Sequence, residues 1–540
     1  MSQSITIVNG GALEGAEQFS RETALWAPSM RSPDQVINGV KPLADARGRD
    51  VVRNNGYASG AAALHKDSIV GAQYRLNAQP NWRLLSTLGG AFDETWADEF
   101  QTVVEARFAL LSDSEAAWLD AQRVNTLTGM IRLAVGIFLM TGEFIATCEW
   151  IREANRPVRT ALQFVSSDRL CNPDGQSDTR TLRRGVERDL RGRALAYHFR
   201  MGERLDPYPD DLSFRWTRVP TIKPWGRKQV IHILEQSLPD QSRGVSEMLS
   251  AMKQMKTLQK FTDVTLQSAI ISASYAAAIE SELPNDAVAA ALGAMGSSDP
   301  GASLLGVYRS YMTALGSYLT DANNIRIDGA QIPHLFPGTK LNITPAKTAG
   351  GVGTGFEESL MRHTAAALGV SYEELSRDFS KTNYSSGRAA MGVSAKFMAS
   401  RKKHLADRIA NEVYALVLEE EMAAGNVPLP RGVTRDDFYQ PLAKEAFTAC
   451  KWIGSGAGQI DELKETQASM LRIASGLSTY EMETARLGND WREVFAQRAR
   501  ENKVIEDLDL TFDTNTVKPN GAIEDPNAAA GNQTGQGAAQ

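Results

Sequence analysis

The chain is poor in cysteine. It has three cysteines in 540 residues, Cys148, Cys171 and Cys450, and no two of them form a C-x-x-C pair. An odd number of widely separated cysteines supports neither a disulfide framework nor a zinc knuckle. The sequence is therefore typical of a protein made in a reducing cytoplasm, and it predicts no metal site.

Long hydrophobic runs are missing as well. The most strongly apolar run, Leu133 to Met140, is eight residues long, whereas a membrane-spanning helix needs about 20. No secretory signal is visible, because Glu14 and Glu17 precede the first basic residue, Arg21. We therefore expect no membrane among the partners.

An excess of positive charge is also absent. The formal net charge is −6 and the pI about 5.7, which disfavours a protein that coats nucleic acid without specificity. The hydrophobic fraction of 42% and the charged fraction of 23% are those of a soluble globular protein. This length corresponds to roughly three to four structural units.

Catalytic motifs are not found. The glycine-rich run 350–355 has the spacing of neither a phosphate loop nor a dinucleotide-binding loop, so we interpret it as a linker. The segment 400–403 matches S-x-x-K without its companion motifs S-D-N and K-T-G. No histidine pairs with another His or Cys at the spacing of a local metal site. We expect no enzyme activity, no catalytic residue, no cofactor and no metal.

Two alternatives stay open at this point. One is a cytoplasmic α/β enzyme whose acid and base are brought together only by folding. The other is a helical scaffold protein that never meets DNA. The enzyme alternative predicts a monomer or small oligomer with a convergent acid and base pocket.

Residue periodicity in the first half predicts helices followed by short strands. Residues 1–40 are weakly patterned and predict a flexible N-terminal arm. A helical pattern runs from Asp45 to Val70 with a break near Asn54-Asn55-Gly56, and residues 93–130 are also helical by their spacing. From 131 to 235 the pattern predicts short strands, among them 144–148, 161–165, 194–199 and 229–234.

The second half is predominantly helical, so the whole chain is predicted to be α+β and helix-dominated. Residues 284–302 form a loose connection, residues 325–347 are strand-like, and the segment 376–386 is a polar loop. The tail 511–540 has almost no large apolar side chain and is predicted to be disordered. The predicted helices are 246–282, 303–320, 356–375, about 387–424, 459–475 and 478–503.

One stretch has a strong local charge. From Lys381 to Arg408 the chain carries seven basic residues and a single acid, Asp407. Two interpretations stay open: a polar helix face whose charges pair with acidic neighbours, or a surface that meets a polyanion. The preceding loop is rich in hydroxyl and amide groups, which contact phosphates without strong charge.

Several sequence blocks occur in the order that one protein family shows. The most specific is Leu368-Gly-Val-Ser-Tyr-Glu-Glu-Leu375, followed by Asp378, Ser380 and Asn383-Tyr-Ser-Ser386 through Arg388. The others are Arg47 to Ala58, Asp168 to Leu170, Gly185 to Glu187, Gly192 to His198, Val230 to Ile233, Pro239 to Ser246, Gly476 to Thr479 and Asp490 to Val494. From about Ala44 to Gln497 the chain thus resembles the bacteriophage portal proteins of the lambda-like family, the head-to-tail connectors of tailed phages.

The resemblance implies a portal fold with a defined order of parts. Residues 284–324 match no part of the family pattern, so the stem within them is not placed. The implied parts are an arm at 1–40, an α/β wing at 41–255, a helical stem or wing segment at 256–320, a clip at 321–350, a stem helix at 351–375, a tunnel loop at 376–387, a long helix at 388–425, a helical crown at 426–510 and a disordered tail at 511–540.

The resemblance also implies a function. About twelve subunits would form a ring at one capsid vertex, a closed assembly in which each subunit uses two different faces. Double-stranded DNA would pass through the ring during packaging and ejection. The other implied partners are the terminase large subunit, the major capsid and scaffold proteins, and the head-completion or tail connector protein. The implied location is the virion, with the host cytoplasm during assembly, and ATP hydrolysis would belong to the terminase.

Within the implied tunnel loop, we expect Lys381 and Arg388 to be the cations that face DNA. Asn383, Tyr384, Ser385 and Ser386 are weaker expected phosphate contacts. A translocation channel must not hold DNA tightly, and each neutralised phosphate strengthens binding. The same residues also fit a second role, with Ser385 or Ser386 as the N-cap of the long helix, and both roles can hold.

Overall fold

The structure is a computed structural model of the chain. It describes residues 30–203, 211–274, 325–327, 330–332, 353–456 and 462–510, together with Leu25, Pro28, Gly306, Arg309 and Thr313. The predicted disordered tail, the connection 284–302, most of the predicted helix 303–320 and most of the predicted arm lie outside these residues. The chain divides into two compact units, the first made of Met1–Arg53, Ala58–Glu247 and Ser394–Gln540, the second of Asn54–Tyr57 and Met248–Val393.

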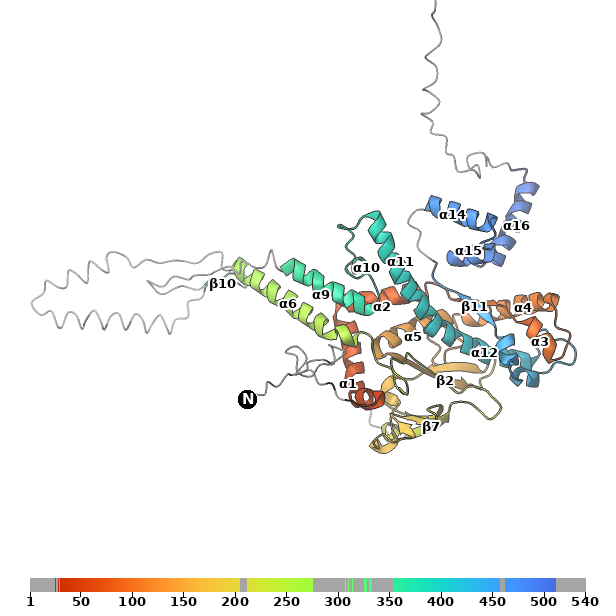
Figure 1. The fold of residues 1–540 in the computed structure, drawn as a ribbon, viewed down its shortest axis with the longest axis horizontal. Coiled ribbons are helices and arrows are strands. Elements are labelled where there is room, and N and C mark those ends of the chain that lie inside the picture. Colours follow the sequence, from red (N-terminus) through yellow and green to blue (C-terminus); the bar gives the residue numbers. More distant parts are fainter. Residues whose placement is uncertain are drawn as a thin grey trace, which may run out of the picture. The chain divides into compact units, whose positions relative to one another are not determined.

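The described residues are α+β and helix-dominated, as predicted (Figure 1). The helices are α1 (Pro33–Asn54), α2 (Gly56–Ile69), α3 (Trp82–Leu88), α4 (Glu94–Ser112), α5 (Leu127–Thr141), α6 (Leu249–Ser274), α9 (Gly353–Leu368), α10 (Tyr372–Ser376), α11 (Tyr384–Arg401), α12 (Asp407–Ala424), α13 (Ala443–Phe447), α14 (Glu462–Ala474), α15 (Tyr480–Arg486) and α16 (Trp491–Asp507). The strands are β1 (Arg75–Ala78), β2 (Glu143–Trp150), β3 (Thr160–Phe164), β4 (Leu182–Arg183), β5 (Val186–Arg188), β6 (Ala194–Arg200), β7 (Trp216–Pro220), β8 (Val230–Leu234), β9 (Ile325–Ile327), β10 (Ala330–Ile332) and β11 (Cys450–Ile453).

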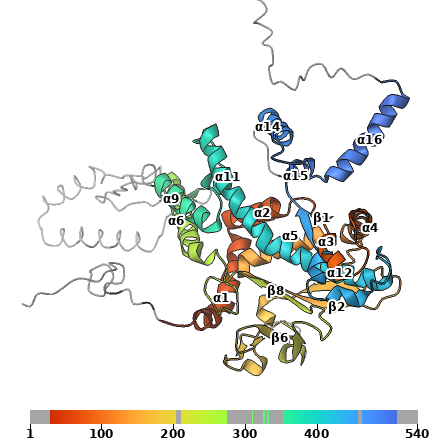
Figure 2. The ribbon, with the colours of Figure 1, turned by 45° about the vertical axis from the view of Figure 1, so that its right-hand side comes forward.

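Two antiparallel sheets form the α/β part of the first unit (Figure 2). Their strand orders are β3-β2-β8 and β4-β5-β6-β7. Ile145 of β2, Tyr197 of β6 and Val230 of β8 belong to one buried apolar cluster, so the two sheets share a core. The four strands predicted between residues 144 and 234 are therefore confirmed.

The apolar run of the sequence is a helix, α5, so the prediction that strands begin at residue 131 is wrong. Thr126 caps α5 by accepting a hydrogen bond from the amide of Gly129, and Gly142 ends it in the left-handed conformation at φ 74°. Side chains are buried around most of its circumference. A helix that is apolar on nearly all sides lacks the 3.6-residue period by which helices are recognised.

Helix α1 begins at Pro33, so the predicted arm at 1–40 is wrong for residues 33–40. Proline suits the first helical position, where its missing N–H costs nothing. The sequence pattern did not predict the first turns of α1 because the face that they bury is polar. Asp34 and Asn38 are both buried. The predicted break near residues 54–56 is confirmed, because α1 ends at Asn54 and α2 begins at Gly56.

The predicted helical stretch 93–130 is not one helix, because it contains α4 and only the first four residues of α5. Asp93 caps α4 by accepting a hydrogen bond from the amide of Trp96 at 2.7 Å. The helix ends at Ser112, and residues 113–126 form turns before α5. In the same way the predicted helix 478–503 is divided into α15 and α16, because Gly488 adopts φ 84° between them.

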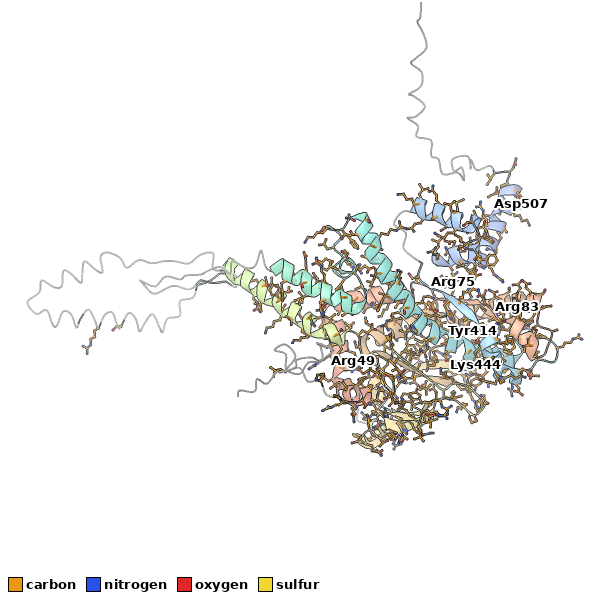
Figure 3. The ribbon with its side chains drawn as sticks, viewed as in Figure 1. Arg49, Arg75, Arg83, Tyr414, Lys444 and Asp507 are labelled. Atoms are coloured by element: carbon orange, nitrogen blue, oxygen red, sulfur yellow. The ribbon has the colours of Figure 1, made fainter. Side chains whose placement is uncertain are left out.

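Residues from the predicted crown pack against the predicted wing. Strand β11 pairs antiparallel with β1, with Arg75 opposite Ile453. Nearby, Phe447 of α13 contacts Trp96 of α4 edge to face with ring centroids 6.2 Å apart. Tyr414 of α12 is buried in the same unit (Figure 3). Residues 443–453 therefore belong to the core of the first unit.

The second unit is built on α6 and α9, which lie side by side (Figures 1 and 2). The ring of Phe261 on α6 contacts that of Phe356 on α9 edge to face at 5.7 Å. The predicted helix 356–375 is wrong as a single element. Gly369 at φ 66° ends α9, and Ser371 and Glu374 form a capping box that starts α10. Strands β9 and β10 form an antiparallel pair within the predicted clip.

Candidate functional site

The predicted tunnel loop lies in the second unit, between α10 and α11. The loop comprises residues 377–383 and is shorter than the predicted 376–387, because α11 already begins at Tyr384. Asn383 Oδ1 accepts a hydrogen bond from the amide of Ser386 at 2.8 Å, and the Ser386 hydroxyl donates to the Asn383 carbonyl at 3.0 Å. This is N-cap geometry. The cap is therefore Asn383, and the expected cap at Ser385 or Ser386 is wrong because both lie in the first turn.

The loop is shaped by its own polar groups. Arg377 ends α10 in the left-handed conformation at φ 56°. Asp378 Oδ1 accepts a hydrogen bond from the amide of Ser380 at 2.9 Å, and the Asp378 amide donates to Ser376 Oγ at 3.2 Å. These bonds set a defined turn just before Lys381.

Lys381 reaches across to helix α9. Its Nζ donates a hydrogen bond to Glu358 Oε1 at 2.5 Å, although the lysine side chain is 75% exposed. This hydrogen bond lowers the pKa of Glu358 and raises the pKa of Lys381. The loop thus presents an accessible ammonium whose charge is already balanced within the same unit.

The remaining predicted site residues follow one another along the start of α11. Asn383, Ser385, Ser386 and Arg388 are exposed. Tyr384 begins the helix, and its side chain lies outside the described part. The structure therefore brings the six predicted residues together on one loop end and the first turns of one helix. Their contact with DNA stays a prediction.

Within the part of the chain that the structure describes, at least four of the seven basic residues between 381 and 408 form ion pairs. Besides Lys381, Arg401 pairs with both Glu235 and Glu247. Asp407 pairs with Lys402 at 3.0 Å and Lys403 at 3.7 Å. For these four, the interpretation as charges paired with acidic neighbours is confirmed. Lys402 to Ala406 form a single π-helical turn between α11 and α12.

Sequence reasoning missed a buried charge cluster in the first unit. The side chains of Glu143 and Arg243 are both 0% exposed and lie 2.6 Å apart, Oε1 to Nη2. Lys41 contacts Glu143 at 3.2 Å and Asp45 at 2.8 Å, and His232 Nε2 lies 3.2 Å from Glu143 Oε2. Burial alone would raise the pKa of Glu143, but the charges of Arg243 and Lys41 hold it well below its ordinary value.

This cluster joins segments that are distant in the sequence. Arg243 also donates to the backbone carbonyls of Leu170 at 2.7 Å and Arg184 at 2.9 Å. The hydrogen bonds and ion pairs of this cluster therefore hold distant segments of the first unit together. The sequence signal that points to this cluster is the block Pro239 to Ser246, which contains Arg243.

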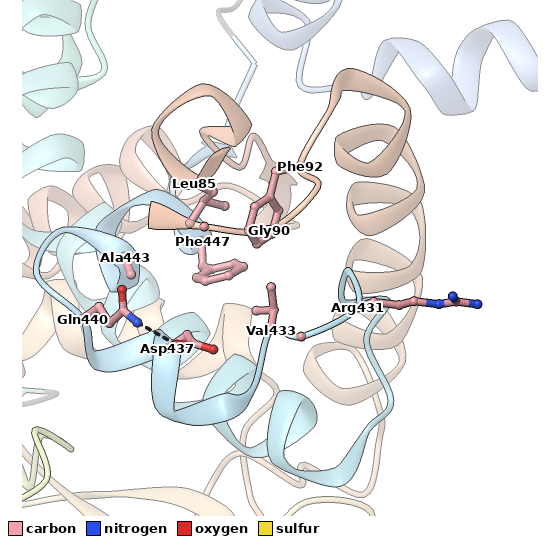
Figure 4. A pocket seen from close by; sticks show the side chains of 11 residues that line it. Leu85, Gly90, Phe92, Arg431, Val433, Asp437, Gln440, Ala443 and Phe447 are labelled. Carbon is pink, nitrogen blue, oxygen red and sulfur yellow. Dashed lines mark hydrogen bonds between the residues drawn. The ribbon is translucent and has the colours of Figure 1, made fainter. Parts of the chain in front are cut away.

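A small cavity lies between α3 and α13 (Figure 4). Its volume is about 270 Å³. Leu85, Phe92, Val433 and Phe447 surround it, while the side chain of Arg431 points away. At its edge, Gln440 Nε2 donates to Asp437 Oδ1 at 2.6 Å. The lining mixes polar and apolar groups, and its one carboxylate is already hydrogen-bonded.

The described residues contain no group of three or more His, Cys, Asp or Glu side chains arranged to hold a metal ion. None of the helices they form is long and apolar enough to cross a membrane.

Comparison with known proteins defines the class of this chain. Residues 19–402 match the profile of the family described as phage portal protein, lambda family. The chain is 37% identical to portal protein B of Escherichia phage lambda over 487 residues, which cover 90% of this chain and 88% of that protein. It is also 37% identical to the portal protein of Escherichia phage N15 over 488 residues, 90% of this chain and 89% of the other. Among solved structures, a chain from the neck of an empty GTA particle, computed with C6 symmetry, matches with a TM-score of 0.38 and 13% identity over 86% of this chain and 96% of that one.

The chain is therefore a phage portal protein. More specifically, it belongs to the lambda family of phage portal proteins, as its sequence blocks predicted. Its role is structural, and as a portal protein it forms a ring at the portal vertex of the virion.

Proposed function

We propose that about twelve copies of this chain form the channel through which double-stranded DNA enters and leaves the capsid, with one chain per position of a closed ring. The loop 377–383 and the first turns of α11 would face the DNA. The observation that carries this assignment is Lys381: its ammonium is accessible, sits on a turn of defined shape, and is held by a carboxylate of α9.

The Lys381–Glu358 pair suits a surface along which DNA must move. An unpaired lysine would bind phosphate, and each neutralised phosphate steepens the dependence of log K on log salt by about 0.9. Glu358 competes with phosphate for the same ammonium. A passing phosphate therefore replaces a hydrogen bond that re-forms when the phosphate leaves. Arg388 would be the second cation that faces DNA. Weaker contacts would come from Asn383, Tyr384, Ser385 and Ser386.

The partners of the ring follow from its place in the virion. We propose that it docks the terminase large subunit during packaging and the head-completion or tail connector protein afterwards. Major capsid and scaffold proteins would surround it during assembly in the host cytoplasm. The chain would have no catalysis of its own, so ATP hydrolysis would come from the terminase.

A matched pair of variants tests the assignment of the loop. In Lys381→Ala we expect lower packaging efficiency, or poorer retention of packaged DNA, with rings of unchanged size in electron micrographs. In Glu358→Gln the freed ammonium should hold DNA more tightly and slow packaging, and the slowing should fade as salt is raised. Packaging at the wild-type level in both variants would remove Lys381 from this role.

A further inference from the structure

Helix α1 buries a polar side and exposes an apolar one. Its buried polar and charged side chains are Asp34, Asn38, Lys41 and Asp45. Its exposed large apolar side chains are Val36 (52%), Val40 (54%) and Leu43 (54%). A surface helix ordinarily has the opposite arrangement, with its apolar stripe facing the core. Large apolar side chains that are exposed side by side mark a surface for interaction.

The buried contacts fix the rotation of α1 about its axis. Lys41 Nζ donates a hydrogen bond to Asp45 Oδ1 at 2.8 Å and lies 3.2 Å from Glu143 Oε1. Asp34 Oδ1 accepts a hydrogen bond from the amide of Ser242 at 2.7 Å. Turning the helix to bury its apolar side would break these contacts and leave buried charges unpaired. The apolar side therefore stays on the surface of the first unit.

The exposed apolar side chains of α1 belong to a row that ends in a cation. Val36, Val40, Leu43 and Arg47 follow one another at intervals of four, three and four residues, which is the spacing of one helix face. Arg47 is exposed, and it has no acidic partner among the residues that the structure describes. The row is thus apolar at its start and positive at its end.

Helix α4 carries a row with the reverse order. Glu99, Val103, Ala106 and Leu110 are also spaced by four, three and four residues. Leu110 is 78% exposed, Glu99 and Ala106 are exposed, and Val103 is partly exposed. Within the described part of the chain, Glu99 has no basic partner. This row is negative at its start and apolar at its end.

Two such helices match position for position when they lie antiparallel. Each row extends over roughly 16 Å at 1.5 Å per residue, and alternating steps of three and four residues form the seam of closely packed helix pairs. Parallel packing would instead place Arg47 beside Leu110. The facing pairs of the antiparallel arrangement are Val36 with Leu110, Val40 with Ala106, Leu43 with Val103, and Arg47 with Glu99.

The two rows of one chain cannot meet each other. Helices α1 and α4 lie on opposite sides of the first unit in both views (Figures 1 and 2). As a portal protein, this chain forms a ring, and a closed ring joins each subunit to its neighbours through two different faces. The occupant that fits the row of α1 is therefore the row of α4 on a second copy of the chain.

We propose that α1 of each subunit packs antiparallel against α4 of a neighbouring copy, with Val40 against Ala106 and Arg47 paired with Glu99. The proposal rests on the formation of the ring and is independent of contact between DNA and the loop 377–383. It assigns one interface between the first units of neighbouring copies to two helices.

Disulfide cross-linking of assembled rings tests the packing of Val40 against Ala106. Rings that contain both Val40→Cys and Ala106→Cys chains should give covalent multimers on mild oxidation, because facing Cβ atoms about 4 Å apart can form a disulfide. Rings of either single variant should give none, as should the wild type with its three native cysteines. Thr95→Cys in place of Ala106→Cys is the matched control, since it lies about 16 Å away along the same helix.

Charge reversal tests the pair Arg47–Glu99 separately. Arg47→Glu and Glu99→Arg should each raise the protein concentration needed for ring formation about tenfold, because like charges then face each other. The chain with both substitutions should assemble as the wild type does, since opposite charges face each other again. Thermal midpoints of the unassembled chains report whether the single variants still fold.

Several outcomes would overturn the pairing. Rings of normal size that give no cross-link between positions 40 and 106 would do so and leave the ring itself standing. Cross-links in rings of Val40→Cys alone would show that two copies of α1 meet. Reversed charges without effect on assembly, or a double variant no better than the single ones, would remove the ion pair. A wild-type chain that forms no ring would overturn the proposed function and this pairing together.

Discussion

Arg243 and Glu143 form a fully enclosed ion pair. The Arg243 Nη2 lies 2.6 Å from Glu143 Oε1, and its Nε lies 3.1 Å from each carboxylate oxygen. Both side chains are 0% exposed. Removing one member of such a pair leaves an uncompensated buried charge, whereas keeping both leaves every charge balanced.

The first prediction follows from this pair. Arg243→Met should destabilise the first unit by about 3–5 kcal/mol, seen as a lower thermal midpoint and lower soluble yield. Arg193→Ala is the control, because its pair with Asp189 is exposed, and such pairs contribute about 0–1 kcal/mol. Equal thermal midpoints for the two variants would contradict the structural role of Arg243.

The second prediction concerns the glycine beside Arg243. A Cβ atom on Gly244 would lie 2.1 Å from the carbonyl oxygen of Gly142. Gly142 and Gly244 both lie in backbone segments that hold Glu143, so neither segment can move away easily. Gly244→Ala should therefore yield little folded protein. Gly392→Ala makes the opposite test: nothing lies within 4 Å of its Cβ position in α11, so helix propensity should stabilise it by about 1 kcal/mol. Normal yield of Gly244→Ala would show that the two segments can separate.

The third prediction is a pH dependence. Burial raises the pKa of Glu105 from 4.5 to about 7, although Gln101 Nε2 and the Ala78 amide donate hydrogen bonds to it. The folded state therefore binds more protons than the unfolded state between these values. The free energy of unfolding should fall by roughly 2–3 kcal/mol as the pH rises from 4.5 to 7.

Denaturation at pH 5 and pH 8 measures this change. Glu105→Gln, which imitates the protonated carboxyl, should flatten the dependence. Glu99→Gln changes an exposed carboxyl on the same helix and should retain it. An unchanged slope in Glu105→Gln would assign the pH dependence to another group.

The fourth prediction concerns the cap of α11. Asn383→Ala removes the acceptor for the Ser386 amide and should cost about 1 kcal/mol locally. The measurement is hydrogen exchange in the first turn of α11, which should become faster. Ser385→Ala changes a neighbouring exposed side chain and should have no such effect. If Ser385→Ala speeds exchange as much as Asn383→Ala does, the cap has been assigned to the wrong residue.

Features that depend on neighbours along the chain could be predicted from the sequence. The break between α1 and α2 follows from Asn54-Asn55-Gly56, and the strands β2 and β8 follow from their short apolar runs. Turn residues and side-chain periodicity act over a few residues, so they can be recognised without the fold. The family followed from the order of several short blocks, each of which is a local feature.

The pairings between distant segments could be found only from the fold. Glu143 and Arg243 are 100 residues apart, and β1 pairs with β11 across most of the chain. A four-residue strand has too short a pattern to reveal its partner, and a buried charge looks like any surface charge until its partner is known. For the same reason the sequence identified Lys381 as an exposed cation, but only the fold showed that Glu358 of α9 holds it.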